Sequence, residues 1–127
     1  MSHSPSASAQ RQRFPRRVRL LRHSDFERVY KLGRRHFAAH MTVFYLQRTE
    51  GDGARIGFTV GRVLGGAVDR NRIKRRLREA VRLSGPQSLP PFDVVVNPKK
   101  SALRAEFSEL SSEISRAFEV MRRASGN

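Results

Sequence analysis

The segment from Gly61 to Arg82 combines a dense set of positive charges with an apolar stripe of helical spacing. Ile73, Leu77, Ala80 and Val81 fall within an arc of about 100° on an α-helix, which is the width of a core-facing stripe. The rest of the circumference is polar, and the segment carries eight Lys and Arg residues against two acids. Such a helix must bury one side in a core and present the other to solvent or to a partner.

Charges of one sign at this density repel one another along a helix, whereas ordinary solvated faces mix both signs. A polyanionic partner relieves the repulsion, and guanidinium groups pair with phosphate in a bidentate way and stack on bases. The whole chain has 127 residues and a formal net charge of +15, which extends the same bias. We therefore expect RNA or DNA as the partner, in preference to a membrane surface or a plain solvated face.

Length and composition narrow the remaining choices. The absence of Cys excludes disulfides and Cys-based metal sites. The sequence contains no run of 18 apolar residues, so no membrane-spanning helix is predicted. No apolar signal-peptide core follows the N-terminus, so a cytoplasmic location is expected. We predict a disordered basic arm over residues 1–17, a single RNA-binding domain over 18–123 and a flexible C-terminus over 124–127. A transit peptide is the weaker alternative for residues 1–17.

Hydrophobic periodicity predicts elements in the order α-β-β-β-α-β-α. Ser24 and Glu27 form a capping-box pattern at the start of the first helix, and Gly33 is placed to end it in a left-handed conformation. A last amphipathic helix is predicted from Leu103 to Met121. Its polar side carries four acids and four cations, so the net positive charge is concentrated elsewhere on the molecule.

Four strands are predicted, near residues 36–39 and over 41–47, 55–60 and 92–96. The Gly-Asp-Gly turn at 51–53 would join the second and third strands in an antiparallel hairpin. The nearly all-apolar fourth strand is typical of a sheet interior. The sequence thus predicts an α+β fold, a two-layer α/β sandwich with its helices on one face of the sheet. The third strand, the basic helix and the last strand form a crossover unit.

Little in the sequence indicates catalysis by the protein. There is no Cys nucleophile, and the four His residues lack an evident set of partners. Hydrolysis of a phosphodiester by a protein generally uses clustered carboxylates that hold metal ions, or a His pair. The acidic residues are instead scattered among basic or apolar neighbours, so we expect neither a protein-borne active site nor a metal site.

The string A-V-D-R-N-R-I-K-R from Ala67 to Arg75, behind a strand and a Gly pair, resembles the signature of the bacterial ribonuclease P protein family. Three further patterns agree with that family: L-x-x-x-x-x-F-x-x-V-Y-x-x-G over 20–33, R-x-G-F-T-V over 55–60 and D-V-V-V over 93–96. The resemblance covers about residues 19 to 121, nearly the whole predicted domain. R-N-R alone is a weak motif, whereas R-N-R-I-K-R in this setting is specific.

The chain departs from the family pattern at three places. The usual Ser-Lys-Lys is Gly61-Arg62-Val63, the usual Asn after Gly65 is Gly66, and Asn97-Pro98 stands where the last strand often ends with an Arg. None of these differences touches the core of the motif from Arg70 to Arg75.

The resemblance implies a left-handed β-α-β crossover and a role as protein subunit of an endoribonuclease whose RNA performs catalysis. It implies ribonuclease P RNA and precursor tRNA as partners, Mg²⁺ used by the RNA-containing holoenzyme, no cofactor held by the protein and no small-molecule substrate. Contacts to the catalytic RNA would come from Arg62, Arg70, Arg72 and Arg75. The 5′ leader would lie against Phe26, Tyr30, Phe44, Thr59, Asn71, Lys74 and Arg78.

Two other functions remain open from the residues alone. A ribosomal protein or RNA chaperone with a similar α/β fold would carry the same basic helix without a preference for precursor tRNA. A DNA-binding helix is less favoured, because no second helix stands in helix-turn-helix relation to residues 70–82.

Overall fold

The computed structural model describes residues 18–20, 22–51 and 53–126, so the arm predicted for residues 1–17 lies outside the described residues. Helices and strands follow the predicted order α-β-β-β-α-β-α, which confirms the α+β class. Their bounds are α2 His23–Leu32, β1 Arg34–Phe37, β2 Met41–Gln47, β3 Arg55–Phe58, α3 Ala67–Leu83, β4 Phe92–Pro98 and α4 Phe107–Gly126, with short 3-10 turns η2 Arg62–Leu64, η3 Pro86–Ser88 and η4 Lys100–Leu103.

The four strands form one sheet in the order β1-β2-β4-β3. β2 is antiparallel to both β1 and β4, whereas β3 is parallel to β4 and connected to it through α3. The predicted crossover unit is therefore confirmed, but the predicted hairpin is wrong because β4 lies between β2 and β3. Residues 92–96 of β4 are all buried, and a strand that is apolar on both faces gains most from an interior position.

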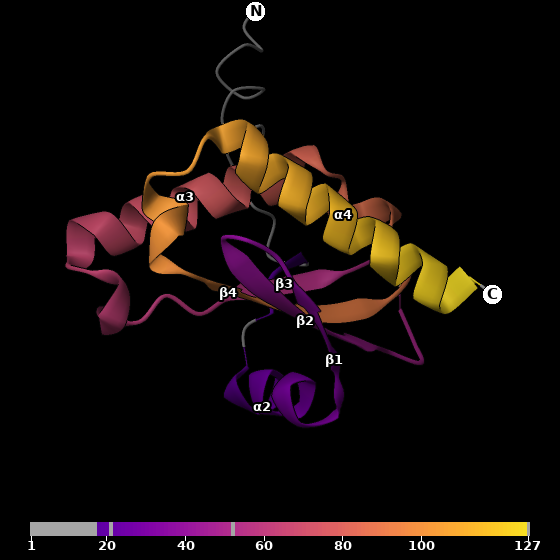
Figure 1. Ribbon diagram of the computed structural model, residues 1–127. Coiled ribbons are helices and arrows are strands. Elements are labelled where there is room, and N and C mark those ends of the chain that lie inside the picture. The colour runs from indigo at the N-terminus through magenta and orange to yellow at the C-terminus, as the bar shows by residue number, and fades with distance from the viewer. Residues whose placement is uncertain (1–17, 21, 52, 127) are drawn as a thin grey trace, which may run out of the picture.

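Helices cover both faces of this sheet (Figure 1). α3 and α4 lie on one face, where Ile73 and Phe118 belong to the main core together with Val94 of β4. α2 lies against the other face, where Val29 packs with Val95. The expectation that all helices share one face is thus wrong for α2, since the central strands carry apolar side chains on both sides and the second side also requires cover. We call this second side the α2 face.

The apolar stripe of α3 is placed as predicted, with Ile73, Leu77, Ala80 and Val81 all fully buried. The last helix begins later than its periodicity indicated, because Leu103 belongs to the turn η4 and α4 begins only at Phe107. The three residues between them carry the chain from the turn into the helix.

The two ends of α2 differ from their sequence signals. The helix begins at His23, its N-cap makes no side-chain hydrogen bond, and Ser24 lies inside the first turn, so the capping-box prediction is wrong. Glu27 instead lies 3.1 Å from His23 Nε2. Gly33 has φ −82° and ψ 176°, which is extended rather than left-handed. A Cβ there would lie 2.5 Å from the carbonyl oxygen of Val29, so this glycine permits close approach of two backbones.

Gly57 of β3 provides the surface on which Phe26 of α2 packs, since an added Cβ would lie 2.3 Å from Phe26 Cζ. Gly57→Ala is expected to push the ring aside and lower the free energy of unfolding by about 1–3 kcal/mol. Gly61→Ala is the matched control, because an added Cβ meets no atom within 4 Å. Urea unfolding of both variants measures the difference, and equal stability would show that Phe26 does not depend on Gly57.

Candidate RNA interface

Two of the eight cations in the basic segment are engaged inside the protein. Arg76 donates hydrogen bonds to three backbone carbonyls between Ala102 and Ala105, which ties α3 to the segment before α4. Arg82 donates to Glu79 and lowers the pKa of that carboxyl. The other six have no ion-pair partner among the described residues: Arg62, Arg70, Arg72, Lys74, Arg75 and Arg78.

The polar residues of α3 form two neighbouring stripes. On an ideal helix, Asn71, Lys74 and Arg78 fall within about 60° of one another, and Arg72 and Arg75 within another arc of about 60°. Four of these five side chains are exposed, and Lys74 is half-buried. One stripe thus carries three of the seven candidates for the leader, and the other carries two of the four candidates for the catalytic RNA.

Arg70 lies apart from the other candidates for the catalytic RNA. Helical geometry places it about 160° from Arg72 and about 40° from Lys74, within the arc of the apolar stripe and one turn before it begins at Ile73. Its Nε is buried and has no hydrogen-bond partner among the described residues. A buried donor without an acceptor carries a free-energy cost, which sets Arg70 apart from the exposed arginines of α3.

A polar and aromatic cluster occupies one end of the α2 face. The hydroxyl of Tyr30 donates to Asn97 Oδ1 at 2.9 Å and lies 3.2 Å from Thr59 Oγ1. Thr59 also donates to Asn97. The rings of Tyr30 and Phe44 meet edge to face with centroids 4.9 Å apart. Hydrogen bonds and ring packing therefore fix the orientation of Tyr30, which remains 38% exposed.

Two further side chains shape this cluster. Phe26 is half-buried against Gly57 and packs with the small apolar core beneath α2. The guanidinium carbon of Arg35 lies 5.6 Å from the centre of the Phe44 ring, in a cation–π arrangement. A base that stacks here would meet Arg35 above Phe44 as well as the exposed part of Tyr30.

The seven candidates for the leader fall into two groups in space. The first group converges on the α2 face, whereas the second belongs to α3, which packs on the other face of the sheet. The chain links the groups through residues 60–66, so one RNA strand that touches both would pass the β3 edge. The first group is Phe26, Tyr30, Phe44 and Thr59, and the second is Asn71, Lys74 and Arg78.

Sequence reasoning missed Asn97 and Arg35 as members of the cluster. In the sequence, Asn97 was noted only because the family often has an Arg near that position. In the structure it accepts hydrogen bonds from both Tyr30 and Thr59. Strand alternation places it on the same side as Val95, which was a usable signal. Arg35 could not be placed without the register that sets it opposite Phe44.

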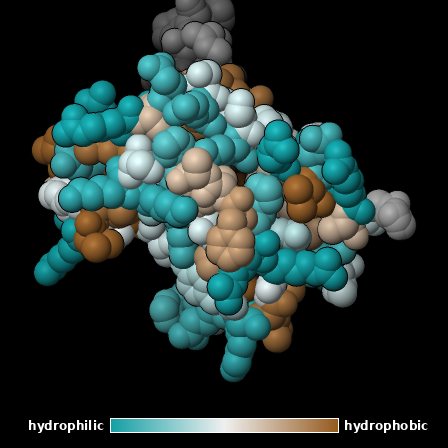
Figure 2. All heavy atoms as spheres, in the orientation of Figure 1, coloured by the Kyte–Doolittle hydropathy of each residue, from teal (hydrophilic) through white to brown (hydrophobic). Residues whose placement is uncertain are grey.

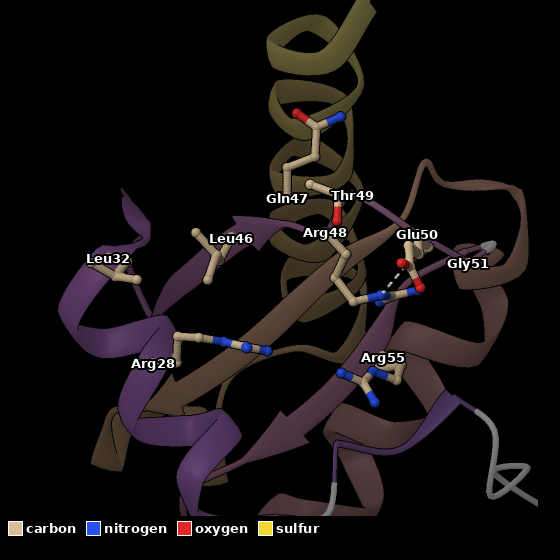
Figure 3. Close-up of a pocket in the computed structure, with 9 residues that line it drawn as sticks. All are labelled: Arg28, Leu32, Leu46, Gln47, Arg48, Thr49, Glu50, Gly51 and Arg55. Carbon is tan, nitrogen blue, oxygen red and sulfur yellow. Dashed lines mark hydrogen bonds between the residues drawn. The ribbon is translucent and has the colours of Figure 1, made fainter.

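At the other end of the α2 face, a buried carboxylate gathers three cations. Asp93 is fully buried and accepts two hydrogen bonds from Arg55 at 2.9 Å and one from Arg48 at 3.0 Å, while Arg28 lies 3.5 Å away. The hydrogen bond between Arg55 and the Asp93 carboxylate raises the pKa of the Arg55 guanidinium. Figure 3 shows the three arginines extending toward one space, an open cavity of about 690 Å³. Since Arg48 and Arg55 bind inward, we assign this cluster a structural role.

The visible surface carries few broad apolar areas. Figure 2 shows hydrophilic side chains over most of this side of the molecule, with hydrophobic ones in small separate groups. Within the described part of the chain, no helix is long and apolar enough to cross a membrane. Surface chemistry of this kind suits a charged partner better than an apolar one.

Comparisons with known proteins agree with this surface chemistry. The family model described as Ribonuclease P matches residues 14–122. The chain belongs to the ribonuclease P protein family. The ribonuclease P protein component of Symbiobacterium thermophilum is 43% identical over 94 residues, covering 74% of this chain and 82% of that protein. For that of Acidothermus cellulolyticus, the identity is 43% over 104 residues, covering 80% and 86%.

The fold agrees as well. The solved structure of the Staphylococcus aureus RNase P protein matches with a TM-score of 0.71 at 26% identity, covering 81% of this chain and 94% of that chain. The resemblance based on R-N-R-I-K-R is therefore confirmed. Members of this family are protein components of ribonuclease P, the holoenzyme that processes the 5′ ends of tRNA, and they work with the ribonuclease P RNA.

Proposed function

We propose that this chain binds the catalytic ribonuclease P RNA through α3 and the 5′ leader of precursor tRNA through the α2 face. It thereby assists the endonucleolytic removal of the leader, which leaves the mature 5′ end of the tRNA. In this proposal the RNA carries out catalysis in the cytoplasm, and Mg²⁺ is bound by the RNA-containing holoenzyme. The protein holds no cofactor of its own and acts on no small molecule.

The observation that carries the proposal is the cluster around Tyr30 in a domain that also presents a basic helix. Unpaired bases of any identity stack on aromatic side chains, while cations follow the backbone. The hydroxyl and amide groups of Thr59 and Asn97 offer hydrogen bonds beside the ring of Tyr30. A leader of variable sequence requires this kind of tolerant contact, whereas duplex RNA hides its bases from such a surface.

The second candidate is a general RNA-binding module such as a ribosomal protein or RNA chaperone. It is favoured by the six cations of the basic segment, which would serve any structured RNA equally well. The two functions differ in the substrate they require, because only the first distinguishes precursor tRNA from mature tRNA.

Reconstitution tests the proposed function. The purified chain is mixed with ribonuclease P RNA at low Mg²⁺ concentration, and cleavage of the 5′ leader is followed. A rise in cleavage is expected for the wild-type chain, a smaller rise for Arg72→Ala, and an unchanged rise for Arg116→Ala on the exposed side of α4. RNA binding without any rise in cleavage would favour the general RNA-binding module.

Phe44→Ala is expected to weaken binding of precursor tRNA to the reconstituted holoenzyme by about 1–3 kcal/mol. The substitution removes a ring that supports Tyr30 and lies beneath Arg35. Mature tRNA has no leader and should bind almost as before. Equilibrium binding of both RNAs to wild-type and variant holoenzyme measures the difference.

Two matched substitutions separate stacking from packing at this position. Phe44→Tyr keeps the ring and should bind precursor tRNA nearly as well as the wild type does. Phe44→Leu fills the apolar space without a ring, so it should keep the stability and lose the leader affinity. Equal weakening toward precursor and mature tRNA would remove Phe44 from the leader site and leave it a core residue.

A further inference from the structure

Phe37 on the edge strand β1 is a large apolar side chain left 69% exposed. In the register of β1 and β2 it lies opposite Thr42, and Arg35 lies opposite Phe44. Opposed residues of paired strands point to the same side of a sheet, so Phe37 shares the α2 face with the Tyr30 cluster. It is two residues along the strand from Arg35, which already covers Phe44.

No described apolar side chain buries this ring. The small core beneath α2 contains Leu20, Val29 and Val95 with their neighbours, and neither it nor the main core includes Phe37. α2 covers the middle of the face and leaves the β1 side open. The ring therefore contributes little to the packing of the domain, and its exposure in water carries a cost that a partner would relieve.

Cations lie on the strand that carries the ring and beside the residue that follows it. Lys99 extends from the end of β4, and its Nζ donates to the carbonyl oxygen of Ala38 at 3.2 Å. Arg35 lies on the same face, and residues 28–49 contain no Asp or Glu. An exposed aromatic ring on a strand with nearby cations is suited to unpaired nucleotides, because the base stacks on the ring while the phosphates meet the charges.

From this placement we infer that Phe37 is a further base-stacking residue for the leader, extending the site from Tyr30 and Phe44 onto β1. Diagonal neighbours on paired strands lie about 7–8 Å apart, which sets the spacing between Phe37 and Phe44. That spacing is about two stacking steps of 3.4 Å, so the two rings can hold different nucleotides of one strand. The inference rests on the proposed function and adds one contact point to the same site.

The test uses the reconstituted holoenzyme with precursor tRNAs whose leaders grow one nucleotide at a time from none. For the wild-type chain, affinity should rise in steps as the leader lengthens. Phe37→Ala should lose one of these steps, about 5- to 150-fold in affinity, while leaderless tRNA binds as before. Phe37→Tyr should keep the step. Leu83→Ala, which removes another exposed apolar side chain at the end of α3, should keep every step.

Two results overturn the inference alone, and a third also overturns the proposed function. Steps that are identical in Phe37→Ala and wild type would show that Phe37 does not contact the leader. A lower molecular mass in solution for Phe37→Ala than for wild type would show that the ring joins two copies of the chain. If the affinity of the wild-type holoenzyme for precursor tRNA did not change with leader length, both the proposed function and this inference would be overturned. Melting curves of Phe37→Ala should match wild type, since the ring is outside both cores.

Discussion

Asp93→Asn is expected to lower the free energy of unfolding by about 2–4 kcal/mol, one of the larger stability losses available to a single substitution in this domain. The carboxylate is fully buried and is the common acceptor for Arg48 and Arg55, with Arg28 nearby. Removing its charge leaves these cations facing one another beneath α2. We place the loss below the largest values for buried ion pairs because all three arginines reach solvent in part.

Urea unfolding of two other variants identifies the cause. Asp25→Asn removes a contact of 3.4 Å to Arg28 and a weaker attraction to Arg55, and it should cost well under 1 kcal/mol. Arg55→Gln combined with Asp93→Asn should cost less than the two single losses added together, because the second change removes a charge that the first left unpaired. Additive losses would show that Arg55 and Asp93 do not act as a pair.

The ion pairs of Asp93 could not be predicted from the sequence. Asp93 belongs to a recognisable D-V-V-V strand, yet in the sequence alone it was treated as one of several acids scattered among basic or apolar neighbours. Its partners come from α2, the end of β2 and β3, and they meet only because β4 lies between β2 and β3. Ion pairs between distant segments follow from topology, and the sequence pointed to a hairpin that would have kept β4 out of that place.

The parts of the fold that depend on local periodicity were predicted well. The stripe of Ile73, Leu77, Ala80 and Val81 required only helical spacing and is fully buried. Likewise, the alternation over 41–47 correctly indicated a strand with apolar side chains on both sides. That second apolar side could also have predicted a helix on the other face, because it needs cover, and α2 is the element that supplies it.

The candidate site was also predicted only in part. The basic helix and its motif were visible in the sequence, and so was the aromatic content of residues 26–44. What the sequence could not supply was which polar groups complete the aromatic cluster. Asn97 joins it because β4 is central and its register brings Asn97 opposite Thr42. The internal use of Arg76 was equally hidden, since its acceptors are backbone carbonyls more than 25 residues away.

Binding of the ribonuclease P RNA to this protein is expected to weaken steeply with salt, with a slope of log K against log salt of about −4 to −5. Six cations on the basic segment lack an ion-pair partner among the described residues, and each that meets a phosphate releases about one counterion. Between 50 and 200 mM salt the affinity should fall by about 250- to 1,000-fold. Titrations in filter-binding or anisotropy assays at several salt concentrations give the slope directly.

Single substitutions then show which cations contribute to the salt dependence of binding. Arg72→Ala should reduce its magnitude by about 1, because one phosphate contact is lost while the fold is kept. Arg116→Ala on the near-neutral helix α4 removes the same charge from the molecule and should leave the slope unchanged. Arg76→Ala should act differently again: its guanidinium holds three backbone carbonyls, so stability should fall with little change in slope. A wild-type slope shallower than about −2 would mean that α3 is not the main contact surface, since six phosphate contacts cannot release so few ions.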